Sequence, residues 1–335
     1  MFNKLKNCKF VNQFVTKIIL ESMTLNSHFE KLKSCTICPR NCNINRLSGK
    51  TGYCGSDAKY NISSIVVHKG EEPVISGERG ICNVFFSRCN LQCIYCQNAQ
   101  ISCNKGDVIS KQYSLDEVTD TIISIFKEHQ INSLGFVSPS HYIPHVISII
   151  ENLRTKGYNP ITVYNTNAYD KVEIIRSLES YINIWLPDFK YMDNTLARDY
   201  SDSINYVQIA TLAIKEMFRQ KGSTIIKNEV GIAESGLIIR HLVLPGKIEN
   251  SLAVLRFIAE ELSPNISVSL MAQYHPVEKL KYHSNLNRKL TPDEYNIIVN
   301  ELDKLGIFRG WIQELESSDH YLPDFENKNP FEKQL

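Results

Sequence analysis

The sequence predicts an α/β fold, a partial barrel of six strand–helix units with a small cysteine-rich appendage at its N-terminal side. Short apolar runs alternate with amphipathic stretches over residues 61–315. Most of these runs are continuously apolar, as in strands that are buried on both faces. Strands that alternate with helices form a parallel sheet with right-handed crossovers. Six units are too few for a closed eight-fold barrel, so a partial, open barrel is expected, with a doubly wound sheet as the alternative.

Local signals place the individual elements. The first strand is expected at Ile81–Ser87, which is mostly apolar. A capping box at Ser114–Glu117 begins a helix that runs to about Gln130, because the Ser and Glu side chains accept hydrogen bonds from free backbone N–H groups. Thr291–Glu294 caps the last helix in the same way. The other expected strands are 133–137, 161–165, 182–188, 237–244, 266–273 and 307–312, and the other expected helices are 144–156, 171–180, 204–221 and 252–262.

The composition is that of an ordinary globular protein. The 335 residues are 43% hydrophobic and carry a net charge of +1. Four regions are expected: an extension (1–30), a cysteine-rich region (31–60), the barrel (61–315) and a polar tail (316–335). The near-neutral charge gives no electrostatic basis for nucleic-acid binding, and no apolar run approaches the length of a membrane span. Neither nucleic acid nor a membrane is therefore expected as a partner.

Ten cysteines gather mainly in two short windows of a chain that shows no clear signal peptide. This distribution favours a reducing compartment with metal or cluster ligation over disulfides, so a cytoplasmic location is expected. The first 22 residues carry Lys4, Lys6, Lys9 and Lys17 against one acid, Glu21. They suit an organelle-targeting peptide, but they lack arginine, so an ordinary basic extension is an equal alternative.

The most specific motif is the C-x3-C-x2-C of Cys89, Cys93 and Cys96. A [4Fe–4S] cluster takes four ligands, so three thiolates leave one iron open to a substrate or cofactor. The motif follows directly after the first expected strand, and parallel α/β proteins place their chemistry at the carboxyl ends of strands. The alternative is a structural zinc loop, which needs a fourth ligand such as Cys82 or Cys103.

The residues around this motif resemble a known family. Phe-Phe-Ser-x-Cys-Asn-Leu-x-Cys-x-Tyr-Cys-Gln-Asn at 85–98 is similar to the cluster loop of pyruvate formate-lyase activating enzymes, in the radical S-adenosylmethionine (radical SAM) superfamily. The resemblance covers about residues 31–315 and fits a poorly characterised branch with an added cysteine motif. Further matching segments are Cys-Pro-Arg-Asn-Cys at 38–42, Gly-Phe-Val-Ser-Pro-Ser-His at 135–141, Val-Tyr-Asn-Thr at 163–166, Leu-Pro-Asp-Phe-Lys-Tyr at 186–191, Arg-His-Leu-Val-Leu-Pro-Gly at 240–246 and Met-Ala-Gln-Tyr-His at 271–275.

The resemblance implies an oxidoreductase. Cys89, Cys93 and Cys96 would hold three irons, and the amino and carboxylate groups of S-adenosylmethionine (SAM) would chelate the fourth. One electron from the cluster would cleave SAM into methionine and a 5′-deoxyadenosyl radical, while the protein positions the reactants and excludes water. The electron would come from a donor such as flavodoxin or ferredoxin. The implied substrate is a protein, such as a glycyl radical enzyme.

The same resemblance implies roles for residues at strand ends. Asp188 and Lys190 point to one face of their strand; Lys190 would bind the SAM carboxylate, and Asp188 would orient it or help hold a cation. A salt-bridged strand end is the alternative. Tyr95 would lie against the adenine or simply pack, and His275 would be a second carboxylate ligand or an ordinary capping residue. Asn165, with Thr166, would bind ribose or a cation or form a turn.

Two further positions carry alternatives. Arg240 and His241 are adjacent in a strand and point oppositely; Arg240 is expected to face the interior, where it binds the cofactor or forms a structural ion pair. The Gly-Gly-Glu motif of the wider family, whose backbone receives the SAM amino group, is replaced here by Ser138-Pro-Ser-His. Backbone carbonyls from Ser138 onward can still serve, and Ser140 or His141 is the candidate to replace the acid.

A second set, Cys35-x2-Cys38-x3-Cys42-x11-Cys54, supplies four thiolates, enough to close a tetrahedral site. It suits a second iron–sulfur cluster, structural zinc or unmetallated thiols. Because four ligands leave no open position, catalysis is not expected there, but a cluster could relay electrons. The remaining cysteines are expected to be small apolar residues; they are Cys8, Cys82 and Cys103.

Three classes of function remain. The first is a radical SAM enzyme acting on a protein or on a small molecule. The second is a non-catalytic iron–sulfur electron carrier, which has no need of a six-unit scaffold with a pocket. The third is a zinc-ribbon module for nucleic acid, which predicts a basic patch with interleaved aromatic residues. The net charge of +1 argues against the third class.

Overall fold

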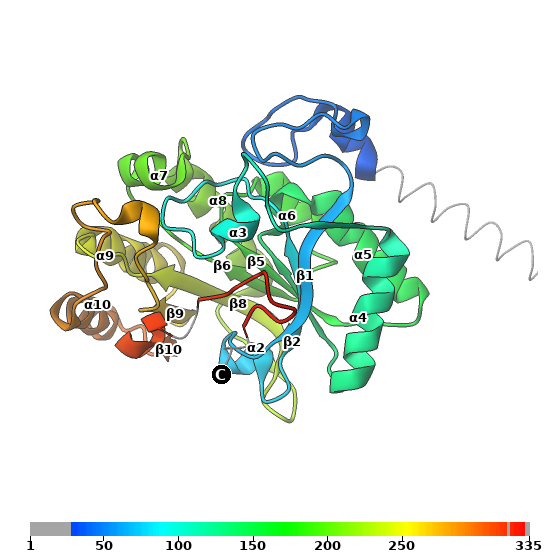
Figure 1. Ribbon diagram of the computed structural model, residues 1–335. Helices are drawn as coiled ribbons and strands as arrows, with labels where there is room; N and C mark the ends of the chain where they lie inside the picture. The colour runs from blue at the N-terminus through cyan, green and yellow to red at the C-terminus, as the bar shows by residue number, and fades with distance from the viewer. Residues whose placement is uncertain (1–27, 320–321, 332–335) are drawn as a thin grey trace, which may run out of the picture.

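The computed structural model describes residues 28–319 and 322–331, so the basic N-terminal segment and Cys8 lie outside the described residues. The strands form one open sheet in the order β10-β9-β8-β6-β5-β4-β2-β1-β3, and β7 pairs with β8 (Figure 1). The strands are β1 (Tyr60–His68), β2 (Ile81–Phe86), β3 (Lys111–Tyr113), β4 (Ser133–Val137), β5 (Ile161–Thr166), β6 (Ile184–Pro187), β7 (Ile226–Lys227), β8 (Ala233–Leu242), β9 (Ser267–Met271) and β10 (Gly310–Ile312).

Helices cover the outer face of this sheet (Figure 1). The helices are α2 (Pro73–Ser76), α3 (Ala99–Ser102), α4 (Leu115–His129), α5 (Ile143–Thr155), α6 (Val172–Ser177), α7 (Asn194–Ser201), α8 (Tyr206–Lys221), α9 (Ile248–Phe257) and α10 (Pro292–Lys304). Short turns of helix add η1 (Lys31–Ser34), η2 (Arg46–Ser48), η3 (Pro139–His141), η4 (Ile258–Leu262), η5 (Glu278–Leu280) and η6 (Leu315–Asp319). None of the described helices is long and apolar enough to cross a membrane.

The predicted parallel sheet of six strand–helix units is confirmed. Strands β2, β4, β5, β6, β8, β9 and β10 pair in parallel. In a doubly wound fold the strand order reverses part-way along the sheet. The parallel strands here follow one another without such a reversal, so the partial barrel is correct and the doubly wound alternative is wrong. The capping boxes at Ser114 and Thr291 are both formed.

Two features of the sheet region differ from the prediction. One edge of the sheet is extended by β1 and β3, which pair antiparallel. The helix expected at 204–221 is present as α8, but a further helix that was not expected, α7, precedes it, with its N-terminus capped by the Asp193 side chain. The break between α7 and α8 lies at Asp202 and Asn205, both in the left-handed backbone region, which Asp and Asn tolerate better than most residues.

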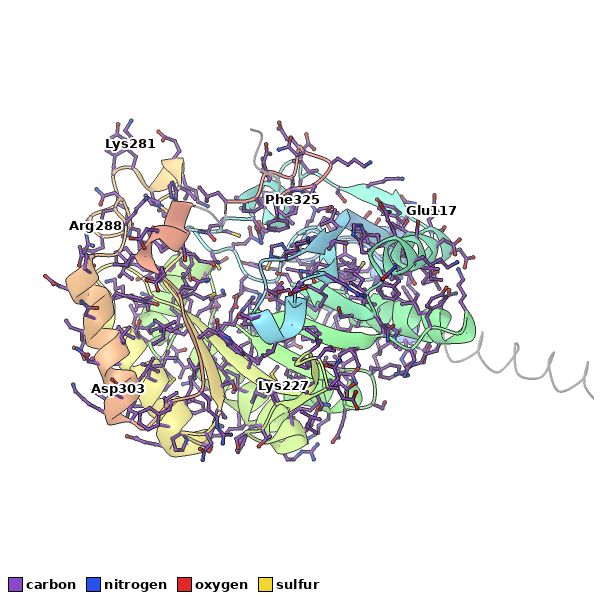
Figure 2. All side chains as sticks on the ribbon, turned by 90° about the horizontal axis from the view of Figure 1, so that it is seen from below. Glu117, Lys227, Lys281, Arg288, Asp303 and Phe325 are labelled. Carbon is purple, nitrogen blue, oxygen red and sulfur yellow. The ribbon has the colours of Figure 1, made fainter. Side chains whose placement is uncertain are left out.

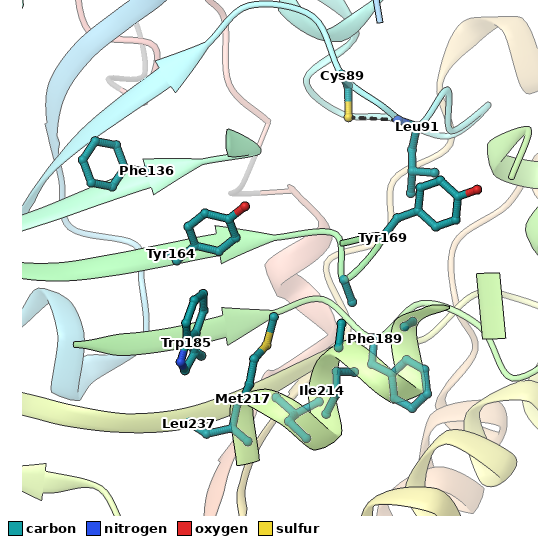
Figure 3. Packing of buried hydrophobic residues seen from close by; sticks show 14 of the residues in the cluster. Cys89, Leu91, Phe136, Tyr164, Tyr169, Trp185, Phe189, Ile214, Met217 and Leu237 are labelled. Carbon is teal, nitrogen blue, oxygen red and sulfur yellow. Dashed lines mark hydrogen bonds between the residues drawn. The ribbon is translucent and has the colours of Figure 1, made fainter. Parts of the chain in front are cut away.

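Large side chains fill the space between the sheet and its helices. Phe136, Tyr164, Trp185 and Leu237 are aligned across neighbouring strands, and Figure 3 shows Met217 of α8 beside the end of this row formed by Trp185 and Leu237. All five side chains are buried. Burial of each such side chain contributes about 1.5–3 kcal/mol, so this layer fixes the strands against their helices.

The base of the concave face of the sheet is apolar. Val163, Ile184 and Ile238 project from the strands and pack with Val74 and Ile75 of α2. Helix α2 therefore closes the base of the barrel. The polar side chains of the concave face lie toward the carboxyl ends of the strands, where a site is expected.

The cysteine-rich region packs directly on the barrel. The Arg46 guanidinium is buried and donates to the backbone oxygens of His141, 2.7 Å away, and Asp57. The His145 ring of α5 bonds the Ala58 oxygen through Nε2 and packs edge-on against Tyr60. These contacts hold residues 28–60 beside η3 and α5, which follow strand β4.

The end of the chain returns to strands β1 and β2. Phe325 packs edge-on against Phe85, with ring centroids 5.4 Å apart, and Figure 2 shows it beside the blue and cyan strands. Phe331 lies 4.0 Å from the His68 ring. The expected polar tail thus includes two aromatic residues that pack on the barrel.

Gly135 of β4 supports the polar end of the concave face. A Cβ atom there would lie 1.9 Å from Oδ1 of the buried Asn83, whose amide donates to Glu71. We predict that Gly135→Ala lowers the free energy of unfolding by about 1–3 kcal/mol, as overpacking does, measured by urea denaturation. In the double variant with Asn83→Ala, which removes the obstacle, Gly135→Ala should cost much less; an unchanged cost would contradict this reading.

Candidate functional site

The C-x3-C-x2-C loop follows β2 and opens onto a pocket at the carboxyl ends of the strands. Cys89, Cys93 and Cys96 all line this pocket. Apolar side chains from several strands form much of the remaining wall, including Phe85, Phe86, Val137, Leu242 and Met271. The three thiols therefore face one shared space.

Each of the three sulfurs makes a hydrogen bond with a neighbouring group. Cys89 Sγ accepts from the Leu91 N–H at 3.4 Å, drawn as a dashed line in Figure 3, and from Asn167 Nδ2 at 3.5 Å. Cys93 Sγ accepts from Ser201 Oγ at 3.0 Å. Cys96 Sγ lies 3.2 Å from Ser102 Oγ. Such bonds stabilise negative charge on sulfur, as a metal-bound thiolate requires.

Burial favours the neutral thiol at Cys89 and at Cys96 until a cation binds them. Burial raises the pKa of Cys89 to about 12, and burial together with the Cys93 charge raises the pKa of Cys96. A metal displaces the protons when it binds. The residues thus provide metal ligands whose charge is formed only with the metal in place.

The arrangement fits a multi-iron cluster better than a single ion. Within the described part of the chain, no three His, Cys, Asp or Glu side chains are close enough to hold one metal ion. A [4Fe–4S] cluster spreads its ligands over four irons, so its thiols must surround a space. Cys82 and Cys103 do not line the pocket, so neither supplies the fourth ligand that the zinc alternative needs.

A charged network forms the wall across from the thiols. Lys190 Nζ lies 2.9 Å from Asp188 Oδ2, and Arg240 Nε lies 2.7 Å from Asp188 Oδ1. Arg240 also contacts Glu71 Oε2 at 3.1 Å and Asn165 Oδ1 at 2.6 Å. Although burial opposes ionisation, the charges of Arg240 and Lys190 hold the pKa of Asp188 below its ordinary value. The network therefore stays ionised.

A chain of hydroxyl groups leads from the pocket wall to one of the sulfurs. Tyr95 lines the pocket, and its hydroxyl lies 2.6 Å from that of Tyr191. The Tyr191 hydroxyl lies 2.7 Å from Ser201 Oγ, which donates to Cys93. Tyr95 is thereby held rigidly beside the loop.

The structure brings most of the predicted site residues together. Tyr95, Ser138, Asp188, Lys190 and Arg240 line the pocket. Asn165 lines an adjoining compartment that shares Ser138, Asp188 and Arg240 with it. Arg240 faces the interior as expected, whereas His241 points away and bonds the Phe189 oxygen and Ser251.

Three predicted candidates lie outside the pocket lining. Ser140 is buried, and its hydroxyl bonds that of Thr166; His141 is also buried and bonds the Ser87 oxygen. His275 does not line the pocket, whereas its neighbours Gln273 and Tyr274 do. Their predicted roles in cofactor binding therefore find no contact with this space.

Sequence reasoning missed the groups that bond the sulfurs. Asn167, Ser201 and Ser102 come from three different segments, and no motif links them to the cysteines. It also missed Glu71, which precedes helix α2 and reaches Arg240 across the barrel. Only the full fold places these side chains at the site.

The four N-terminal cysteines also meet. Cys35, Cys38, Cys42 and Cys54 line a second, smaller cavity. It lies where η3 and the cysteine-rich region pack together, since Arg46 and His141 also line it.

Comparisons with known proteins bear on the iron–sulfur site. The family model for a 4Fe-4S single cluster domain matches residues 75–205. Uncharacterized protein MJ0674 of Methanocaldococcus jannaschii is 30% identical over 278 residues, which are 82% of this chain and 76% of the relative. This chain belongs to the same family as that protein. The matched segment contains Cys89, Cys93 and Cys96, which supports a [4Fe–4S] cluster at this loop.

Solved structures similar to this chain share little of its sequence. A domain of a pyruvate-formate lyase-activating enzyme from Bacteroides vulgatus is 15% identical, with a TM-score of 0.36 over 51% of this chain and 93% of that one. The FeFe-hydrogenase maturase HydG from Carboxydothermus hydrogenoformans is 13% identical, with a TM-score of 0.47 over 89% of this chain and 67% of that one.

The hydrogen bond from Ser201 to Cys93 should tune the reconstituted cluster. Hydrogen bonds to sulfur set cluster potentials, and this one favours the reduced form because it stabilises added negative charge. We predict that Ser201→Ala lowers the reduction potential by roughly 20–60 mV, the equivalent of one hydrogen bond for a one-electron couple, measured by redox titration. The control is Ser203→Ala, which removes a nearby buried hydroxyl that donates to the Ala197 oxygen; a shift of equal size in both variants would contradict the assignment.

Proposed function

We propose that this protein is a radical SAM enzyme that reductively cleaves S-adenosylmethionine at a [4Fe–4S] cluster. The observation that carries the proposal is the pocket onto which three thiols and Lys190 open together. Three ligands leave one iron free, and a cationic side chain suits the carboxylate of SAM. When bound, the cluster supplies one electron to the sulfonium, which gives methionine and a 5′-deoxyadenosyl radical.

The charged wall assigns parts to individual residues. Lys190 Nζ binds the SAM carboxylate, and Asp188 orients the lysine through their 2.9 Å contact. Because Arg240 also pairs with Asp188, the lysine retains donor capacity toward the pocket.

Backbone and aromatic groups complete the proposed cofactor site. Ser138 adopts the left-handed conformation, with φ 52°, and lines the pocket, so its backbone can receive the SAM amino group. Tyr95 lies against the adenine. Asn165, whose oxygen is held by Arg240, is placed to bind a ribose hydroxyl.

The apolar wall serves the second requirement of radical chemistry. Phe85, Phe86, Leu91, Ile101 and Met271 line the pocket. A primary carbon radical reacts with nearly any nearby group, so the walls must hold the substrate close and exclude competing molecules. This is the contribution of the protein rather than of its cofactors.

The resemblance of residues 85–98 to activating enzymes supports a protein substrate, such as a glycyl radical enzyme. It also supports a flavodoxin or ferredoxin as the electron donor. The proposed location is the cytoplasm.

One observation favours a small molecule as the substrate instead. The adjoining compartment is lined by Glu71, Glu72 and Arg240 and is bordered by Pro323 and Phe331 of the C-terminal segment. A polypeptide would have to displace that segment, whereas a small polar substrate would not.

Anaerobic reconstitution tests the reaction itself. After loading with iron and sulfide and reduction by dithionite, the wild type should convert SAM to 5′-deoxyadenosine, and Cys93→Ala should not, because it lacks a cluster ligand. Chromatography measures the product. Cys103→Ala is the matched control and should behave like the wild type; equal turnover in Cys93→Ala and the wild type would refute the cluster assignment.

Lys190 tests the proposed carboxylate contact. Lys190→Gln should weaken SAM binding about 10-fold or more, the effect of losing one charge-assisted hydrogen bond, while leaving iron content unchanged. Equilibrium binding of SAM to the reconstituted protein measures this. Lys171→Gln, which removes a lysine that pairs with Glu173 away from the pocket, should bind SAM normally; unchanged binding by Lys190→Gln would show that Lys190 does not hold the cofactor.

A further inference from the structure

The N-terminal cysteines form a built site rather than a chance cluster. Cys35, Cys38 and Cys54 are each only 6% exposed, and all four thiols line one small cavity. Ile37 and Ile44 supply apolar walls. Four soft ligands around a closed space are suited to a metal centre with no open position.

The backbone around Cys42 is fitted to its sulfur. Tyr53 donates its N–H to Cys42 Sγ at 3.3 Å. Gly52 approaches the same thiol so closely that a Cβ atom would lie 2.7 Å from the sulfur. Only glycine therefore allows residues 52–54 to close over this side of the cavity, and the N–H bond favours a charged thiolate there.

Arg46 is an independent sign that the cavity holds an anion. Its side chain is 1% exposed. It donates hydrogen bonds to two backbone oxygens and to Cys35 Sγ, which lies 3.8 Å from Nη1. No carboxylate pairs with Arg46 in the part of the chain that the structure describes. A buried charge without a counter-charge is costly, and a centre ligated by four thiolates would supply the missing negative charge.

The spacing of the thiols favours a cluster over zinc. Tetrahedral zinc holds sulfurs at 2.3 Å, and therefore about 3.8 Å from one another. Among the described residues, no group of three or more His, Cys, Asp or Glu side chains is arranged to hold a single metal ion. The same is true of Cys89, Cys93 and Cys96, which lie in the segment that matches a 4Fe-4S domain. Both sets thus surround a space, as cluster ligands do.

A short path joins this cavity to the first cysteine loop. Arg40, two residues after Cys38, donates from Nε to the Asn90 oxygen at 2.9 Å. Asn90 is bonded to Cys89, and its side chain accepts from Asn167 Nδ2 at 2.8 Å. Asn167 Nδ2 also lies 3.5 Å from Cys89 Sγ. The Arg40–Asn90 hydrogen bond therefore connects the segment that carries Cys38 with the segment that carries Cys89.

We propose that Cys35, Cys38, Cys42 and Cys54 hold a second, fully ligated [4Fe–4S] cluster that exchanges single electrons with the cluster of the Cys89–Cys96 loop. Each cluster takes up one electron, from the 2+ to the 1+ state, and passing it on restores the 2+ state; no bond or proton changes place. The electron comes from a low-potential one-electron donor, dithionite in the experiment below. The presence of a cluster at the four N-terminal cysteines does not depend on the proposed function. The electron exchange does, because it requires the cluster of the Cys89–Cys96 loop.

Iron and sulfide counting tests the occupancy. After anaerobic reconstitution the wild type should hold about eight irons and eight sulfides per chain. A Cys38→Ser/Cys54→Ser variant and a Cys89→Ser/Cys93→Ser/Cys96→Ser variant should each hold about four. Cys103→Ser is the control and should keep about eight. Four irons with one zinc in the wild type would overturn the proposal, as would loss of all iron from the Cys89→Ser/Cys93→Ser/Cys96→Ser variant while circular dichroism shows it folded.

Electron paramagnetic resonance tests the exchange. When both clusters are reduced by dithionite, their spins should interact, so the wild-type spectrum should differ from the sum of the spectra of the two variants. A wild-type spectrum equal to that sum would overturn the exchange. The signal that survives in the Cys89→Ser/Cys93→Ser/Cys96→Ser variant should not respond to SAM, because the cluster has no open iron. Failure of SAM cleavage in the wild type would leave these readouts intact, so the two proposals fail separately.

Discussion

The buried guanidinium of Arg240 is the interaction on which the site depends. It joins Asp188 at the end of β6, Asn165 on β5 and Glu71 ahead of α2. Although burial opposes its charge, Asp188 and Glu71 hold the pKa of Arg240 above its ordinary value. Removing one partner of such a buried network leaves uncompensated charge at a cost of about 3–5 kcal/mol. The network therefore fixes the strand ends from which Lys190 reaches the pocket.

The division of the sheet into apolar and polar parts makes this network possible. The helix side is filled by large side chains such as Tyr164 and Trp185, and α2 seals the base of the concave side. The charged network of Arg240, Asp188 and Lys190 lies at the carboxyl ends of the strands. There the thiols, their hydrogen-bond donors and the cations share one enclosure, and low local dielectric strengthens the interactions among them.

Much of the fold and part of the site follow from the sequence. Apolar runs and capping boxes place β2, β4, β5, β6, β8, β9 and most helices, because local signals determine them. Cys89, Asp188 and Lys190 are predictable because each stands at a strand end within a motif. Asn167, Ser201 and Glu71 are not, because their partners are distant in sequence. His275 was expected at a strand end, but β9 ends at Met271, and Gln273 and Tyr274 form the wall instead.

The central claim is that one iron of the loop cluster is open and that SAM binds it directly. Electron–nuclear double resonance on the reduced protein, with SAM labelled with ¹⁵N at its amino group, tests this claim most directly. The Cys38→Ser/Cys54→Ser variant isolates the loop cluster for the measurement. The account predicts a hyperfine coupling between the labelled nitrogen and the cluster. A cluster spectrum without such coupling, at SAM concentrations that saturate the protein, would contradict it.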